Sequence, residues 1–78
     1  MSDAGAISTR RVWFGDPPLR CDACSASVAD QFVDGALRHG PWAIMCPTCH
    51  SRHGRGLGTG RGQHYVRAAD GRLEKRAG

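Results

Sequence analysis

The sequence contains no long hydrophobic run. None of its stretches approaches the roughly 20 consecutive apolar residues that a transmembrane helix needs. Residues 1–14 also lack the uninterrupted apolar segment of a secretory signal peptide. These absences argue against a membrane protein and against a secreted one. We therefore expect a cytoplasmic protein in a reducing compartment.

Large apolar side chains are scarce as well. Glycine occupies 11 of the 78 positions, and the aromatic residues are two Trp, two Phe and one Tyr. This length permits one domain with a small hydrophobic core. Domains this small usually need an additional stabilising feature, such as a bound metal. We expect a frayed segment over residues 1–6 and a single domain over residues 7–78.

The chain has four cysteines in two pairs of identical spacing, Cys21 with Cys24 and Cys46 with Cys49. In each pair, two thiolates from one tight turn can reach the same ion. Two such turns complete the tetrahedral four-sulfur shell that zinc prefers. We predict one structural Zn²⁺ bound by all four cysteines. A closed shell of this kind leaves no open position for a catalytic water.

Paired cysteines have two other common uses in proteins. Four cysteines can form a disulfide framework in a small secreted protein, but a reducing compartment favours metal. A thioredoxin-like redox pair opens a helix within a βαβ unit, for which this chain has no room. Bound zinc contributes on the order of 10 kcal/mol to folding, which is comparable with the whole stability of a small domain.

The first half of the chain predicts short strands. Residues 8–14 combine β-branched and aromatic residues and end at a turn over 15–18, which indicates a strand. Residues 31–37 and 42–45 flank the turn-rich segment 38–41 and predict a hairpin that delivers Cys46 to the metal. Asp34 and Gly35 could instead form the turn, although the preceding strand would then be very short.

Beyond Cys46 the pattern favours a helix. Pro47 suits a first helical position, and we expect the helix to run to His53 and end at Gly54. We expect a treble-clef-like zinc finger, a small zinc-stabilised α+β fold made of a knuckle, a hairpin and a short helix that holds the second cysteine pair. The runner-up is a zinc ribbon, which ends in a strand. Residues 63–68 and 72–76 predict a closing hairpin that could pair with residues 11–14.

Glycine occupies every second position from Gly54 to Gly62. One interpretation is a flexible arm whose glycine and arginine content suits contact with phosphates. The other is an extended segment packed tightly against the domain, with Leu57 inward. The segment matches neither nucleotide-binding glycine motif.

Positive charge is concentrated after residue 50. Residues 51–78 carry a net charge of +5, and ten of the chain's eleven cationic residues are arginine, which suits bidentate phosphate contacts. We predict DNA or RNA binding through the basic C-terminal half. We expect Tyr65 or an exposed Trp42 to stack on a base. The phosphates should be bound by four arginines: Arg52, Arg55, Arg61 and Arg67.

Residues 42–50 resemble the metal-binding half of HNH endonucleases, which also place a C-x-x-C-H motif at a helix start. Those enzymes carry a catalytic histidine pair or Asp-His pair and an asparagine on the preceding hairpin. Here that hairpin offers only His39, and the chain has no asparagine. We therefore expect no enzyme and no small-molecule substrate. We expect His50 to support the metal site or face solvent rather than bind the ion.

A second resemblance covers residues 20–66. The segments 32–36, 40–50 and 56–63, with Tyr65, resemble small zinc-finger proteins encoded by tailed bacteriophages. The resemblance implies a zinc fold in a bacterial host cell, to which the glycine segment belongs, and implies no mechanism. Besides nucleic-acid binding, the alternatives are binding of a host protein, such as RNA polymerase or a defence factor, and a self-associating structural role.

Overall fold

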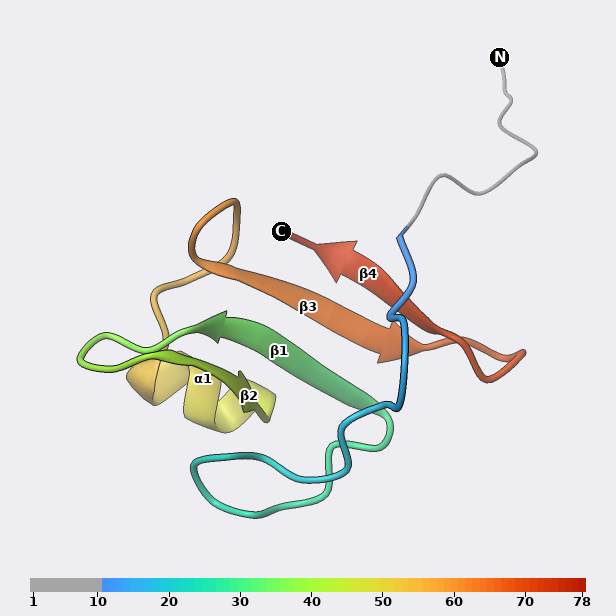
Figure 1. Cartoon of the computed structure of the whole chain (residues 1–78), viewed down its shortest axis with the longest axis horizontal. Coiled ribbons are helices and arrows are strands. Elements are labelled where there is room, and N and C mark those ends of the chain that lie inside the picture. The colour runs from blue at the N-terminus through green and yellow to red at the C-terminus, as the bar shows by residue number, and fades with distance from the viewer. Residues whose placement is uncertain (1–10) are drawn as a thin grey trace.

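The computed structural model describes residues 11–78, so the expected frayed segment over residues 1–6 lies outside the described residues. One helix and four strands follow the order β1 (Gln31–Ala36), β2 (Trp42–Met45), α1 (Pro47–His53), β3 (Gly62–Arg67) and β4 (Leu73–Ala77). The strands form one sheet in the order β2-β1-β3-β4, with α1 packed near β1 and β2 (Figure 1). Within residues 11–78, no helix has the length and apolar character that crossing a bilayer requires.

Both predicted hairpins are confirmed. β1 pairs with β2 in an antiparallel register that sets Val33 opposite Met45, and β3 pairs with β4 across the turn that contains Gly71. Asp34 pairs with Ile44 inside the first hairpin, so the alternative of a turn at Asp34 is wrong. β3 then pairs with β1 and joins the two hairpins into one sheet.

The strand expected over residues 8–14 is not formed by its described part, and residues 8–10 lie outside that part. Val12 makes a single bridge to Glu74, flanked by hydrogen bonds from the Trp13 N–H to the Leu73 carbonyl (2.9 Å) and from the Lys75 N–H to the Arg11 carbonyl (2.8 Å). The expected pairing of residues 11–14 with the β3–β4 hairpin is thus limited to this one bridge. It stops there because the chain turns away at a glycine with φ of 81°, just before two prolines.

The core lies against the sheet and is dominated by Phe32. This side chain is fully buried, together with Met45 and the nearly buried Val28. The Phe32 ring stacks on Tyr65 with ring centroids 5.4 Å apart and meets Trp13 edge-on at 5.1 Å. An aromatic cluster of this kind packs β1 and β3 against the segment that precedes the first cysteine pair.

Helix α1 begins and ends where the sequence predicts. Pro47 occupies its first turn, and Cys46 caps it by accepting the Cys49 N–H on its sulfur at 3.4 Å. At the other end, the Gly54 N–H donates to the His50 carbonyl at 2.9 Å. The cap and the second cysteine pair are therefore the same structural unit.

The glycine alternation has two separate causes. Gly54 and Gly62 lie in close contacts, because an added Cβ would overlap the His50 ring at one and lie 3.0 Å from the Gly56 carbonyl at the other. Gly56, Gly58 and Gly60 have positive φ values of 82°, 125° and 77° with open space around them. The segment is thus a folded loop with tightly packed ends. The interpretation in which Leu57 packs inward is wrong, since its side chain is 40% exposed.

Candidate metal centre and basic end

The four cysteines converge although they come from two distant turns. Their sulfur atoms all lie within 4.8 Å of one another, and the Cys24 and Cys46 sulfurs are 3.8 Å apart. A tetrahedral shell with metal–sulfur bonds of about 2.3 Å has edges of about 3.8 Å. A disulfide would instead bring two sulfurs to about 2.05 Å. The observed spacing therefore fits four ligands around one metal ion.

The first pair lies on a tight knuckle. The Cys21 N–H donates to the Ala26 carbonyl at 2.8 Å, and the Ser25 N–H donates to the Cys21 carbonyl at 2.9 Å. Ser25 takes a left-handed φ of 65° to close this turn. The result directs the sulfurs of Cys21 and Cys24 toward the second pair.

Asp22 fastens the knuckle to β2. Its carboxylate accepts the Ile44 N–H at 2.9 Å, and its own N–H donates to the Ile44 carbonyl at 2.8 Å. Ile44 lies two residues before Cys46, so the two hydrogen bonds set one cysteine pair beside the other. The sequence carries no signal for this role, because the partner is the backbone of a strand 22 residues away.

The electrostatics of the cluster favour a cation. Burial raises the pKa of Cys49 to about 12, and the three neighbouring thiols add to the effect. Burial also acts to raise the pKa of Cys21, but backbone N–H groups, including that of Ala23, outweigh it and lower the value to about 6. Four sulfurs this close lose all their protons only when a positive ion compensates the charge. The donor set and its charge therefore fit a bound metal.

The histidines lie outside the cluster. His50 directs its Nε2 to the Gly56 carbonyl, 2.8 Å away, and so supports the glycine loop. His64 is 2.9 Å from the Gln31 amide oxygen, and burial, with His50 and Arg76 nearby, lowers its pKa. Within residues 11–78, the group assembled for a metal is made of the four cysteines.

The predicted nucleic-acid contacts fall into two sets. Arg52, Arg55 and Arg61 are exposed, and their side chains have no ion pair or hydrogen bond within residues 11–78. Arg67 instead donates to the carbonyls of Ala29 (2.8 Å) and Gly71 (2.6 Å), and Tyr65 packs in the aromatic cluster. The second set holds the fold together.

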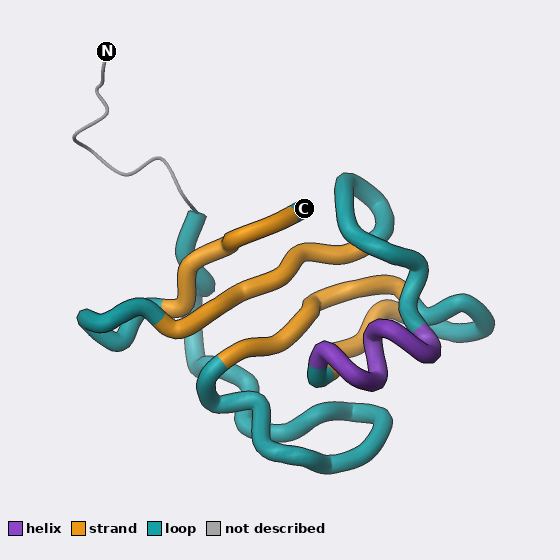
Figure 2. Tube along the Cα trace, turned by 180° about the vertical axis from the view of Figure 1, so that it is seen from behind, coloured by secondary structure: helices purple, strands orange, loops and turns teal. Residues whose placement is uncertain are grey.

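Arg38 is a further exposed arginine without a carboxylate partner within residues 11–78, although its side chain has one hydrogen bond, and no local sequence signal singles it out. Its N–H donates to the His53 carbonyl at 2.8 Å, and its Nε donates to the Gly54 carbonyl at 3.0 Å. The Arg61 carbonyl accepts the Ala36 N–H at 2.8 Å, so the β1–β2 turn, the end of α1 and the glycine loop meet at one end of the sheet (Figures 1 and 2). We call this surface the basic end, and its four arginines are Arg38, Arg52, Arg55 and Arg61.

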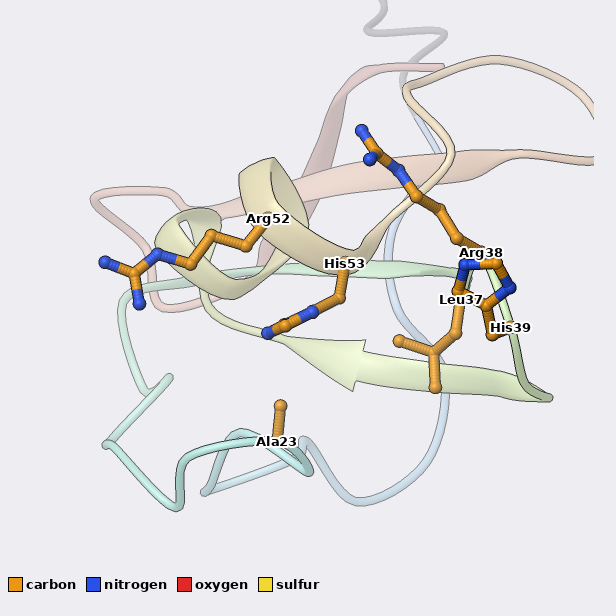
Figure 3. Close-up of a pocket in the computed structure, with 6 residues that line it drawn as sticks. All are labelled: Ala23, Leu37, Arg38, His39, Arg52 and His53. Carbon is orange, nitrogen blue, oxygen red and sulfur yellow. The ribbon is translucent and has the colours of Figure 1, made fainter.

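A hollow of about 360 Å³ opens at the basic end, between the first knuckle, α1 and the β1–β2 turn. Its six lining residues are Ala23, Leu37, Arg38, His39, Arg52 and His53 (Figure 3). Two arginines and two histidines share this lining with two apolar side chains, and no carboxylate among residues 11–78 belongs to it.

Two features of the described residues thus bear on function, the four-cysteine cluster and the basic end. The cluster holds the two halves of the fold together, and the basic end collects arginines that have no carboxylate partner within residues 11–78, beside a hollow. Comparison of the chain with protein-family models, with curated proteins and with solved structures found no match.

Proposed function

We propose that the chain is a non-enzymatic, treble-clef-like zinc finger that binds nucleic acid through its basic end. The element order supports the fold assignment, because a knuckle, a hairpin and a helix follow in turn and the second cysteine pair opens the helix. A zinc ribbon would continue as a strand at that point. A tetrahedral shell of four thiolates suits Zn²⁺ and leaves no position for a catalytic water.

The same proposal includes the cellular setting. Resemblance over residues 20–66 to small zinc-finger proteins of tailed bacteriophages supports a role in the cytoplasm of a bacterial host. Paired metal-binding thiols suit that compartment, because its reducing conditions keep them free of disulfides.

One observation carries the nucleic-acid assignment: arginines without a carboxylate partner gather at one end of the molecule. None of the four arginines of the basic end has a carboxylate partner within residues 11–78. In contrast, Arg72 pairs with Asp70 at 2.8 Å and Arg76 pairs with Glu74 at 3.7 Å. Free guanidinium groups bind phosphates in a bidentate manner and release counterions from the nucleic acid.

We expect the Arg55→Gln/Arg61→Gln variant to bind a labelled oligonucleotide about 10-fold or more weakly at low salt. Each lost phosphate contact should also flatten the plot of log affinity against log salt by about one unit, or about two units for the pair. Fluorescence anisotropy over a salt series measures both quantities.

The matched control is Arg11→Gln/Arg72→Gln, which removes the same charge from residues outside the basic end. We expect this variant to keep nearly wild-type affinity and slope. Equal losses in the two variants would contradict a localised interface. Absence of binding by the wild-type chain at low salt would remove the nucleic-acid function altogether.

A protein partner is the second candidate, and two exposed apolar side chains favour it. Trp42 on the edge strand β2 is 45% exposed, and Leu57 on the glycine loop is 40% exposed. Tryptophan is enriched among the anchors of protein interfaces, and Leu57 adds exposed apolar surface. If the chain binds a host protein, wild-type chain should recover a stoichiometric partner from nuclease-treated bacterial lysate, and Trp42→Ala/Leu57→Ala should not. Recovery of no such partner, or equal recovery by the variant, counts against this candidate.

A further inference from the structure

The hollow at the basic end has walls that are held in place by hydrogen bonds. The two bonds between Asp22 and Ile44 attach the knuckle that carries Ala23 to the sheet. The bond from the Arg38 N–H to the His53 carbonyl attaches the β1–β2 turn to the end of α1. Because these bonds hold the knuckle on β2 and the turn on the end of α1, the hollow is a formed feature of the fold.

Its interior suits the face of a flat ring. Figure 3 shows the His53 side chain pointing from α1 toward Ala23, with Leu37 to one side. The His53 imidazole is exposed and has no hydrogen-bond partner within residues 11–78. Nucleic-acid bases stack on aromatic side chains, histidine included, and apolar groups such as the Ala23 methyl can cover the opposite face.

Positive charge lies beside the hollow. Arg52 extends from α1 on one side, whereas the Arg38 side chain runs from the turn along the end of α1 and points away from Ala23 (Figure 3). The final carbonyls of a helix repel anions, but here Arg38 covers those of His53 and Gly54 with its N–H and its Nε. A strand that inserts one base therefore finds Arg52 for a neighbouring phosphate.

The size of the hollow limits what can enter. At about 360 Å³ it lies at the lower end of the roughly 300–1,000 Å³ usual for small-ligand sites. That volume holds one flat heterocycle with its sugar. Bases within a duplex are stacked and paired, so they reach such a site only after leaving the helix.

We propose that the hollow binds one unpaired base of a single-stranded nucleic acid, stacked on His53 with a neighbouring phosphate on Arg52. This inference rests on the proposed nucleic-acid function and adds a preference for single strands over duplexes. The shared ligand is an unpaired nucleotide, whether its source is DNA or RNA.

The test measures the affinity of the zinc-loaded full chain for a single-stranded DNA, the matching single-stranded RNA and the corresponding DNA duplex. Single strands should bind at least about 10-fold more tightly than the duplex. Removing the ring with His53→Ala, or filling the hollow with Ala23→Leu, should weaken single-strand binding by about 5- to 100-fold. Duplex affinity should stay unchanged, because contacts of the arginines with phosphates remain.

His53→Phe separates stacking from charge, since it keeps an aromatic ring and should retain single-strand affinity within about 3-fold. Ser51→Ala, an exposed change on α1, is the control for the helix. Metal content and an NMR amide spectrum confirm the folding of each variant. If Ala23→Leu does not fold, His53→Ala and His53→Phe still provide the test, because His53 is exposed. Equal affinity for single strands and duplex, or single-strand affinity unaffected by His53→Ala, would overturn the inference, as would an equal loss in His53→Phe and His53→Ala. Absence of all nucleic-acid binding would instead remove the proposed function on which the inference depends.

Discussion

The Cys49→Ser variant is expected to lose its fold. Cys49 is 8% exposed and lies in the cluster that joins the first knuckle to α1. A structural zinc ion contributes on the order of 10 kcal/mol, whereas small domains are stable by about 5–15 kcal/mol in total. A serine hydroxyl does not replace the thiolate, so most of the metal's contribution should disappear. Chelation of the metal from the wild-type chain should have the same result.

Far-UV circular dichroism and an NMR amide spectrum measure this loss, before and after a chelator is added in reducing buffer. Elemental analysis of the wild-type chain should find one zinc per chain. Ser51→Ala, an exposed change on the same helix, should keep both the native spectrum and the metal. A native spectrum in a metal-free, reduced chain would contradict the structural role of the cluster. A different bound metal would contradict the assignment of zinc and leave the structural role of the cluster intact.

Phe32→Ala is expected to lower the free energy of unfolding by about 3–5 kcal/mol. The side chain is 0% exposed, and its removal leaves a cavity between two further rings. Its contacts with Trp13 and Tyr65, at centroid distances of 5.1 and 5.4 Å, each contribute about 0.5–1.5 kcal/mol beyond burial. The aromatic cluster should thus supply a second large part of the stability, apart from the metal.

The matched control is Phe14→Ala, which deletes the same ring at a position that is 87% exposed. We expect this variant to stay within about 0.5 kcal/mol of the wild type. Urea unfolding should be compared at one saturating zinc concentration, because bound metal shifts the apparent stability by mass action. Similar losses in both variants, or a small loss in Phe32→Ala, would show that the cluster does not stabilise the fold as its burial indicates.

The elements of the fold were accessible from local sequence signals. Pro47 and Gly54 mark the two ends of α1 because the first needs no N–H partner and the second closes the helix against His50. Turn residues over 38–41 and 69–71 marked both hairpins correctly. In contrast, residues 11–14 have strand-like composition but form only one bridge, because the turn that follows leads the chain away from the edge.

Local sequence signals could not predict which residues form the basic end. A count of charge along the sequence places the basic part after residue 50 and so leaves out Arg38, yet the β1–β2 turn brings Arg38 to the end of α1. The same count treated Arg67 as a surface charge, although it donates to two carbonyls inside the fold. Tyr65 likewise had the chemistry of a base-stacking residue, and the sheet register turned it toward Phe32.

The sequence by itself determined that four thiolates can meet at one ion, because each pair is spaced within a single turn and sulfur chemistry selects the metal. The tertiary structure alone decided which arginines share a surface and that a hollow opens beside them. Those properties depend on strand register and on hydrogen bonds between segments far apart in the chain, such as Asp22 with Ile44, which no local pattern encodes.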